Sequence, residues 1–299
     1  MSIDAAVIPV AGRGTRLLPL TKSQPKEMLP LGRKPVVQYV VEELAACGMH
    51  RMLFVTGPGK TAIENHFDID AELTQSLRET GKEELLRELA FERDDIEYFY
   101  TRQRRQLGLG HAVLCAKPMV GQQPFVVALG DSVIGLGASS RVVARLIDEF
   151  ERHQADAVVA FEEVPKAEVS QYGIAEVAGK NNDADAATFT LRSIVEKPAA
   201  ADAPSNLAVA ARYVCSPRIF EFLERTPPGK SGEIQFTDAL RLMIESGGRV
   251  LGVRLAPEER RYDVGNFNSY FSAFVETALA DPDCGEALRQ HVNRLLRRD

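Results

Sequence analysis

The sequence lacks the features that mark secreted, zinc-binding or membrane-spanning proteins. Its four cysteines lie far apart and include no Cys-x-x-Cys pair, which fits neither a zinc site nor a disulfide framework. No apolar stretch approaches the roughly 20 residues that cross a bilayer. The first residues show no basic segment followed by an apolar one, so we expect no signal peptide. These absences predict a cytoplasmic protein that does not contact a membrane.

An excess of basic charge is also missing. The formal net charge is −6, whereas a nucleic-acid-binding protein usually presents a basic face. Charged residues make up 26% of the chain, close to the share in ordinary globular domains. The 45% hydrophobic content is sufficient for one large domain or two small ones. We therefore expect a globular protein that binds no nucleic acid.

Short apolar runs alternate with helical patterns along the chain. Continuous apolar runs of this length are typical of strands that are covered on both faces. Between the first two runs, Pro35 begins a helix with one apolar stripe and Gly48 ends it. The repeated strand–helix–strand pattern predicts a doubly wound, Rossmann-like α/β fold, with a mixed, mostly parallel sheet flanked by helices. The expected strands are Ala5–Val10, Met52–Val55, Phe125–Leu129, Ala157–Phe161, Ile174–Val177 and Phe189–Val195, and a second helix is expected over Arg141–Arg152.

No repeat and no Pro- or Ser-rich linker divides the chain, so residues 1–299 are expected to form a single domain. Its first half would cover about 1–135 and its second half, with added sheet, about 136–280, followed by a C-terminal helix over 281–299. The charged, helix-forming segment from about Asp70 to Ala90 is expected to lie outside the sheet. A polar turn over Gly179–Ala187 is expected to join two strands.

A glycine-rich loop, Ala11-Gly12-Arg13-Gly14-Thr15-Arg16, follows the first predicted strand. Glycines allow the backbone to approach a ligand closely, and their N–H groups can face phosphate oxygens. The dinucleotide fingerprint G-x-G-x-x-G would need a glycine where Leu17 stands, and Pro19 prevents an immediate long helix. The loop instead carries cations that suit a triphosphate, although basic residues in loops are more often only solvated. These cations are Arg13, Arg16, Lys22 and Lys26.

A second glycine-rich turn, Gly57-Pro58-Gly59-Lys60-Thr61, resembles the end of a P-loop. The pattern G-x-x-x-x-G-K-[ST] would need its first glycine at position 54, which is Phe54. We therefore interpret this segment as a strand-to-helix turn in which Thr61 is the helix N-cap.

Several long blocks resemble the sugar-1-phosphate nucleotidylyltransferases. The blocks Val10–Pro19 and Pro25–Pro30 resemble the signature of that family. Further blocks narrow the resemblance to the bacterial UTP–glucose-1-phosphate uridylyltransferases, and together they extend from about Ala5 to about Leu279. Several blocks in the same order are more specific than any single motif. The further blocks are Glu64–Asp68, Leu107–Ala116, Pro204–Ala208, Thr226–Gly229 and Gly232–Ala239.

The resemblance implies an enzyme that transfers a uridylyl group from UTP to α-D-glucose 1-phosphate with Mg²⁺, giving UDP-glucose and pyrophosphate. The first half of the chain would bind the nucleotide and the second half the sugar phosphate. A homo-oligomer, either a dimer or a tetramer, is expected, with the Asp70–Ala90 segment and the C-terminal helix as candidate contact surfaces. Two alternatives stay open: a related transferase that uses dTTP, CTP or another hexose 1-phosphate, and a catalytically silent regulatory paralogue.

The same resemblance assigns roles to individual residues. The catalytic set would be Arg16 and Lys26, which hold the triphosphate, and Lys197, which neutralises the sugar phosphate. The nucleotide would be bound by Ala11, Gly12, Gly14, Thr15, Gln103 and Gly108, with Gln103 reading the uracil edge. The sugar would be bound by Gly173, Glu196 and Lys197, and the metal by Asp131 and Asp263.

Each of these assignments also has an ordinary structural interpretation. Asp131 could cap the turn after its strand, and Glu196 with Lys197 could form an exposed ion pair. Gln103 could be a polar residue at a strand end, and His111 could simply begin a helix, so we assign it no role. For two polyanionic substrates to react, Asp131 and Asp263 must lie close together, and Lys26 and Lys197 are expected to face one cleft.

The sequence departs from the pattern of the family in three places, one block and two single positions. The block Gln103–Leu107 contains two arginines where relatives usually have small or apolar residues and a lysine. Gly130 stands where a proline commonly precedes the metal aspartate, and Ala211 replaces a usual glycine before Arg212. None of the three changes removes a proposed reactive group.

Overall fold

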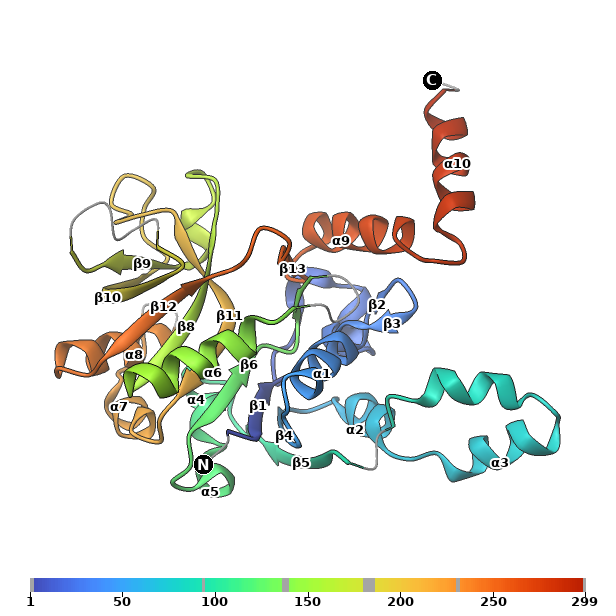
Figure 1. Cartoon of the computed structure of the whole chain (residues 1–299), viewed down its shortest axis with the longest axis horizontal. Helices are drawn as coiled ribbons and strands as arrows, with labels where there is room; N and C mark the ends of the chain where they lie inside the picture. Colours follow the sequence, from blue (N-terminus) through green and yellow to red (C-terminus); the bar gives the residue numbers. More distant parts are fainter. Residues whose placement is uncertain (1–2, 93–94, 136–139, 180–185, 230–231, 298–299) are drawn as a thin grey trace.

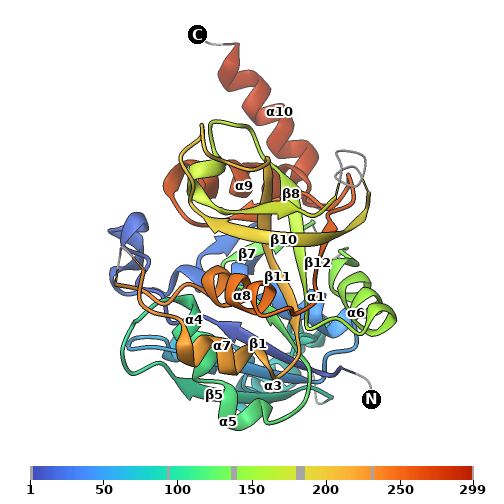
Figure 2. The same ribbon diagram turned by 90° about the vertical axis from the view of Figure 1, so that its left-hand side faces the viewer.

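The computed structural model describes residues 3–92, 95–135, 140–179, 186–229 and 232–297. A nine-stranded sheet runs through both halves of the chain in the order β5-β4-β1-β6-β11-β8-β12-β10-β9. Helices pack on both of its faces (Figures 1 and 2), so the predicted α/β architecture is confirmed. The strands of the first half are β1 (Ala5–Pro9), β4 (Arg51–Thr56), β5 (Glu97–Arg102) and β6 (Phe125–Ala128). Those of the second half are β8 (Ala157–Glu163), β9 (Gly173–Val177), β10 (Thr188–Glu196), β11 (Leu207–Cys215) and β12 (Val250–Arg254).

Two groups of helices cover the sheet. On one face lie α1 (Val36–Ala46), α2 (Thr61–Phe67) and α6 (Val142–His153), and on the other α4 (Leu109–Leu114), α7 (Ile219–Arg225) and α8 (Phe236–Glu245). Each face therefore has its own apolar core, as the continuous apolar strands predict. The expected helices are α1 and α6. Thr61 is the first residue of α2 and not its N-cap, because the first helical turn already begins with the Lys60 carbonyl, which accepts from Ile63 N at 2.9 Å.

Parallel and antiparallel pairs are equally common between neighbouring strands of the main sheet. In the described part of the chain, four of the eight neighbouring pairs are parallel: β5–β4, β4–β1, β1–β6 and β8–β12. The expected predominance of parallel pairs therefore holds only in the first half. Strands β9, β10 and β11 run antiparallel to their neighbours, and β9 and β10 are consecutive strands that need no helical crossover. Most of the polar turn expected between them, residues 180–185, lies outside the described residues.

The strand order creates a switch point between β1 and β6. The chain passes from β1 to β4 and β5 on one side, and then returns to β6 on the other side of β1. Because β1 and β6 are parallel neighbours, their carboxyl ends open the same crevice, which is where ligands bind in open α/β sheets. The glycine-rich loop follows β1 and Asp131 follows β6, so the fold places both at this crevice.

Four short strands form two small sheets beside the main one. They are β2 (Pro30–Leu31) with β3 (Lys34–Pro35), and β7 (Ser132–Ile134) with β13 (Arg261–Asp263). A separate apolar cluster joins these small sheets to the start of α1 and to α9 (Phe267–Leu279), with Leu17, Leu31, Val133 and Val264 at its centre. This cluster fixes the segment after the glycine loop against the strand that carries Asp263.

The Asp70–Ala90 segment lies outside the sheet layers, as expected, and forms α3 (Ala71–Glu79) and a 3₁₀ helix, η4 (Glu83–Leu89). The short helix α5 (Lys117–Val120) packs Val120 into the apolar core on one face of the sheet. The C-terminal helix, α10, begins at Gly285 and not at residue 281, and residues 298–299 lie outside the described ranges. Figures 1 and 2 show α10 projecting from the body of the molecule. None of the described helices combines the length and apolar character needed to cross a membrane.

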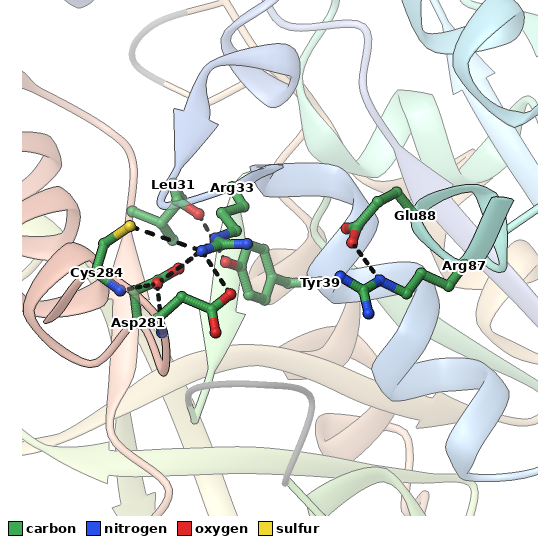
Figure 3. Close-up of polar contacts among 8 residues, drawn as sticks. Leu31, Arg33, Tyr39, Arg87, Glu88, Asp281 and Cys284 are labelled. Atoms are coloured by element: carbon green, nitrogen blue, oxygen red, sulfur yellow. Dashed lines mark hydrogen bonds and ion pairs between the residues drawn. The ribbon is translucent and has the colours of Figure 1, made fainter. Parts of the chain in front are cut away.

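Arg33 anchors the turn between α9 and α10 to the β2–β3 hairpin. Its Nε lies 2.6 Å from Asp281 Oδ2, and its Nη2 lies 2.9 Å from Asp283 Oδ2. Figure 3 shows the guanidinium reaching across to this turn, where Cys284 also lies. Beside it, the Tyr39 hydroxyl donates to Leu31 O at 2.6 Å. These contacts set the direction in which α10 leaves the body.

Candidate active site

A cavity of about 620 Å³ opens at the carboxyl ends of β1 and β6. Loops from the first half of the chain form most of it, and the segment before α8 closes one side. The predicted site residues in its lining are Ala11, Gly12, Gly14, Thr15, Lys26, Gln103, Gly108 and Asp131. The structure therefore brings the predicted nucleotide-binding residues to one place.

The two glycines of the loop differ in backbone conformation and in their neighbours. Gly14 adopts φ 66°, in the left-handed region that favours glycine, and its carbonyl accepts from Thr21 Oγ1 at 2.7 Å. At Gly12, an added Cβ would meet Lys26 Cε at 3.6 Å, an ordinary contact. Gly14 is thus needed for the backbone turn, and Gly12 lies directly beside the Lys26 side chain.

Lys26 and Asp131 form an ion pair in the cavity. Burial alone would lower the pKa of Lys26, but the charges of Asp131 and Glu27 outweigh it, and the pKa is raised. Burial would likewise raise the pKa of Asp131, but Lys26 holds it below its ordinary value. Both side chains are therefore charged at neutral pH.

Asp263 lies next to Asp131 because β7 and β13 pair in antiparallel register. Asp263 is opposite Ser132, and Val264 N donates to Asp131 O at 3.0 Å. Burial raises the pKa of Asp263, and the negative charge of Asp131 raises it further. Two neighbouring carboxylates that repel each other form an electrostatic site for a cation.

Arg16, an exposed residue of the 3₁₀ turn η1 (Thr15–Leu17), completes this cluster. Its positive charge contributes to lowering the pKa of both Asp131 and Asp263. A Cβ built on Gly265 would lie 2.8 Å from Asp263 Oδ2 and 3.2 Å from Arg16 Nη2, so the three residues are packed together. The two predicted metal aspartates and the two predicted triphosphate cations therefore lie in one cluster, in which Lys26 and Asp131 line the cavity and Arg16 and Asp263 are not among its lining residues.

The donor set fits a hard divalent cation that takes its remaining ligands from elsewhere. Mg²⁺ is usually held by one or two carboxylates together with water and substrate phosphates, and Asp131 and Asp263 supply two. Among the described residues, no group of three or more His, Cys, Asp or Glu side chains is arranged to hold a metal ion. A cation at this pair would thus depend on phosphate oxygens.

Two of the three predicted sugar-binding residues line a second cavity of about 590 Å³, and Gly173 is not among its lining residues. Glu196 and Lys197 line it, with Lys197 Nζ 3.4 Å from Glu196 Oε1. Thr237 Oγ1 donates to Glu196 Oε2 at 2.7 Å. Gly173 is paired with Glu196 across β9 and β10, and a Cβ on Gly173 would meet Thr237 Cγ2 at 2.8 Å. The glycine thus allows the Glu196–Thr237 contact to form against β9.

Lys26 and Lys197 do not face one cleft, contrary to our expectation. Lys26 lines the first cavity and Lys197 the second, and the lining residue common to both is Gln235. The separation arises because Lys26 lies beside β1, whereas Lys197 follows β10 near the far end of the sheet. The Lys197 side chain is 55% exposed and turns back toward Glu196.

Sequence reasoning missed a buried ion pair behind Lys26. Lys60 Nζ lies 2.6 Å from Glu27 Oε2, and the two side chains are 6% and 1% exposed. Burial raises the pKa of Glu27, whereas Lys60 and Lys26 act to lower it. A lysine in a glycine-rich turn after a parallel strand was a usable signal, but only the rejected P-loop interpretation gave it a role.

Gln106 was also missed. It accepts a hydrogen bond from Arg13 Nε, and its Nε2 donates to Ala11 O at 2.7 Å. The side chain therefore ties the segment after β5 to the glycine loop, and both segments line the first cavity. This residue belongs to the block that departs from the family pattern, where nothing in the sequence indicated its partner.

Comparisons with known proteins find relatives that match nearly the whole chain. The family model described as "Nucleotidyl transferase" matches residues 5–279. A Methanocaldococcus jannaschii protein is 43% identical over 98% of this chain and 100% of its own length. The UTP–glucose-1-phosphate uridylyltransferase of Staphylococcus epidermidis is 40% identical, over 98% of each chain. The solved structure of a UTP-bound UGPase from Acinetobacter baumannii has a TM-score of 0.88 and 38% identity, and it covers 98% of this chain and 100% of its own. The chain therefore belongs to the nucleotidyl transferase family.

Proposed function

We propose that this chain transfers a uridylyl group from UTP to α-D-glucose 1-phosphate, forming UDP-glucose and pyrophosphate. The observation that carries the proposal is the cluster of Arg16, Lys26, Asp131 and Asp263 beside the glycine loop. It occurs in a chain that is 40% identical to a uridylyltransferase of this specificity.

The reaction needs no general base from the protein. A phosphate monoester has a second pKa of about 6, so the sugar phosphate is already largely a dianion near neutral pH. One of its oxygens attacks the α-phosphorus of UTP, and the bond from that phosphorus to the bridging oxygen of the β-phosphate breaks. The electron pair leaves with pyrophosphate, so no proton transfer is required.

The protein must instead bring two polyanions together. Repulsion between two unit charges about 4 Å apart costs on the order of 4 kcal/mol at intermediate dielectric. Arg16 and Lys26 hold the triphosphate and steady the departing pyrophosphate. Asp131 and Asp263 would hold Mg²⁺, which would supply positive charge to offset that of the phosphates. Positioning and charge neutralisation are the usual means of catalysis in phosphoryl-type transfers.

The second cavity supplies the attacking group. Glu196 accepts hydrogen bonds from sugar hydroxyls beside Gly173, and Lys197 neutralises the sugar phosphate. Because Lys197 lines the neighbouring cavity, the substrate must extend past Gln235 toward the triphosphate. The half-exposed side chain of Lys197 has the freedom to follow it. The nucleotide half, about 1–135, and the sugar half, about 136–280, thus act on one substrate pair.

A panel of substrates tests the proposal. Pyrophosphate release is measured for UTP, dTTP, CTP and ATP, each with glucose 1-phosphate and with other hexose 1-phosphates. We expect the highest kcat/KM for UTP with glucose 1-phosphate. A higher value for another pair would replace the substrate assignment, and no release with any pair would favour the catalytically silent paralogue.

A cytoplasmic homo-oligomer is part of the proposal. Apolar side chains are exposed on α9 and α10, with Phe271 at 57%, Val275 at 49% and Leu296 at 71%. An isolated helix shorter than about 12–15 residues is marginal in water, and α10 projects from the body with little cover (Figure 2). A second copy of this chain in a dimer or tetramer would cover this surface.

A further inference from the structure

Gln103 is held in one orientation by two contacts. It follows β5, and its side chain is almost fully buried at the wall of the first cavity. Its Nε2 lies 3.0 Å from Gly108 O and 3.0 Å from His111 Nδ1. Its backbone N donates to Thr56 O at 2.9 Å, which fixes the residue at the end of the sheet.

The chemistry of these two partners determines which end of the Gln103 amide faces which way. A backbone carbonyl can only accept, so the atom near Gly108 O must be the amide nitrogen. The second amide hydrogen then points to His111 Nδ1, which must carry no proton in order to accept it. Both donor hydrogens are used within the protein. Gln103 Oε1 makes no hydrogen bond within the described part of the chain.

His111 is itself rigidly placed. It lies in the first turn of α4, where Gly110 N donates to Ile234 O at 2.8 Å. A Cβ on Gly108 would meet Glu233 Cβ at 2.7 Å, and a Cβ on Gly110 would meet Ile234 O at 2.8 Å. These close approaches explain the glycines on both sides of Leu109, and they keep the His111 ring against Gln103.

The surroundings of the ring favour its neutral form. Burial lowers the pKa of His111, and the positive charge of Arg105 lowers it further. The Cys115 thiol lies 3.8 Å from Nδ1, one helical turn away. A neutral ring with its proton on Nε2 leaves Nδ1 as the acceptor that Gln103 needs.

The base of the nucleotide distinguishes the two orientations of the amide. At its Watson–Crick edge, uracil donates a hydrogen bond from N3–H, whereas cytosine has an unprotonated N3 that accepts. A glutamine that presents only its oxygen can pair with the uracil N3–H but opposes the cytosine N3 lone pair. If the amide were reversed, its preference would be reversed too.

We propose that His111 is a positioning residue that makes the enzyme select UTP over CTP, because it holds the Gln103 amide with its oxygen toward the base. The inference rests on the proposed function, in which Gln103 reads the uracil edge. His111 itself contacts no reacting atom.

The test compares selectivity, which a merely structural role would not change. The variant His111→Phe keeps a planar ring but removes the acceptor. We expect its kcat/KM ratio for UTP over CTP to fall at least tenfold. His111→Asn places an amide oxygen near the position of Nδ1 and should therefore keep much of the wild-type kcat/KM ratio for UTP over CTP. Cys115→Ala, which removes the other side chain in contact with the ring, is the matched control and should keep the wild-type ratio.

An unchanged kcat/KM ratio in His111→Phe, including equal losses of kcat/KM with UTP and with CTP, would overturn the inference. Dissociation constants for UTP and CTP, measured by calorimetry, give the same comparison for variants with little turnover. The variant Gln103→Leu distinguishes the proposed role of Gln103 from that of His111. If it keeps the wild-type selectivity, Gln103 does not read the base, and both assignments fall. If Gln103→Leu loses selectivity and His111→Phe does not, only the role of His111 is refuted.

Discussion

The charges at the active site are paired before any substrate binds. Lys26 pairs with Asp131 and Lys60 with Glu27, while Asp263 lies close to Arg16. A buried charge without a partner costs several kcal/mol, so these pairs allow ionised groups to persist in the interior. In the proposed reaction, a bound triphosphate would take Lys26 from Asp131, and Asp131 would then be free to hold the cation.

Asp131 provides the sharpest test at the scale of one residue. Asp131→Asn removes the negative charge but keeps the size of the side chain, and Glu27 and Asp263 still offer negative charge to Lys26, so the fold should survive. We expect turnover at saturating UTP and glucose 1-phosphate to fall by orders of magnitude, because the proposed cation loses one of two ligands. Steady-state kinetics over a range of Mg²⁺ concentrations measures the effect. Asp148→Asn, on the exposed side of α6, is the matched control, and near-normal rates for Asp131→Asn would refute the metal assignment.

Lys197 tests whether the second cavity holds the sugar phosphate. Lys197→Ala should raise the KM for glucose 1-phosphate at least tenfold and leave the KM for UTP nearly unchanged, because the lysine lies away from the triphosphate cavity. Initial rates at varied concentrations of each substrate separate the two effects, with the exposed Lys166→Ala as control. If both KM values rise together, Lys197 serves the nucleotide, and the division between the cavities is wrong.

At the scale of elements, α6 receives its N-terminal cap from a distant segment. Glu259 Oε1 accepts from Arg141 N at 2.9 Å, and its Oε2 accepts from Ala256 N at 2.9 Å. A carboxylate beside the first turn satisfies an N–H group that has no helical partner, and it suits the positive end of the helix dipole. Burial would raise the pKa of Glu259, but these donors together with Arg145 hold it below its ordinary value of 4.5.

This cap predicts a pH-dependent loss of stability. Glu259→Gln should lower the free energy of unfolding by about 2 kcal/mol at neutral pH, since charge-assisted hydrogen bonds are replaced. Because the pKa of Glu259 is lower in the folded state, its contribution is fully present above about 4.5 and is lost as the pH falls through the folded value. Urea unfolding should therefore show a smaller difference between wild type and variant at about pH 4. Glu258→Gln is the exposed control. A difference that is constant over this pH range would contradict the role of the carboxylate.

The elements that follow simple periodicity were predictable from the sequence. The strands β1, β4 and β6 contain continuous apolar runs, which indicate burial on both faces of a sheet. Helix α1 has Pro35 at its start, Gly48 after its end and one apolar stripe between them. The antiparallel insertion of β11 between β6 and β8 was not predictable, because strand order depends on contacts between distant segments. Its register shift brings Ala211 to φ 61°, which gives a physical reason for the glycine usual at this position.

Residues of the candidate site could be predicted from the sequence only where the type of residue indicates a single chemical role. The glycine loop and Asp131 could be placed at the switch point because both directly follow buried parallel strands. The partners of Lys60 and Gln106 could not, since each meets a side chain or backbone group from a different loop. Lys26 and Lys197 are separated by the strands that lie between β1 and β10, and no local sequence pattern indicates that strand order.

At the scale of the whole molecule, the arm formed by α9 and α10 is tied to the catalytic region. Arg33 holds the turn between these helices (Figure 3). Tyr270 of α9 donates to Pro30 O at 3.1 Å, just after the 3₁₀ turn that carries Lys26. A subunit contact through the arm would therefore steady the segment that carries Lys26, which we propose holds the triphosphate. This link gives the proposed homo-oligomer a function beyond stability.

Sedimentation velocity tests the proposed subunit contact. The wild type should sediment as a dimer or tetramer, and the double variant Phe271→Glu with Leu296→Glu should sediment as a monomer, because it places charges on the exposed apolar surface. Ile69, which is 63% exposed beside α3, provides the control Ile69→Glu. A monomeric wild type would contradict the oligomer, and disruption only by Ile69→Glu would move the contact to the α3 segment.

A ³¹P NMR time course of the purified protein with UTP, glucose 1-phosphate and Mg²⁺ tests uridylyl transfer most directly. We expect the resonances of UDP-glucose and pyrophosphate to grow in equal amounts while those of both substrates decline, and we expect Asp131→Asn to abolish this change. Hydrolysis of UTP without UDP-glucose, or the same time course in Asp131→Asn, would contradict uridylyl transfer at this site.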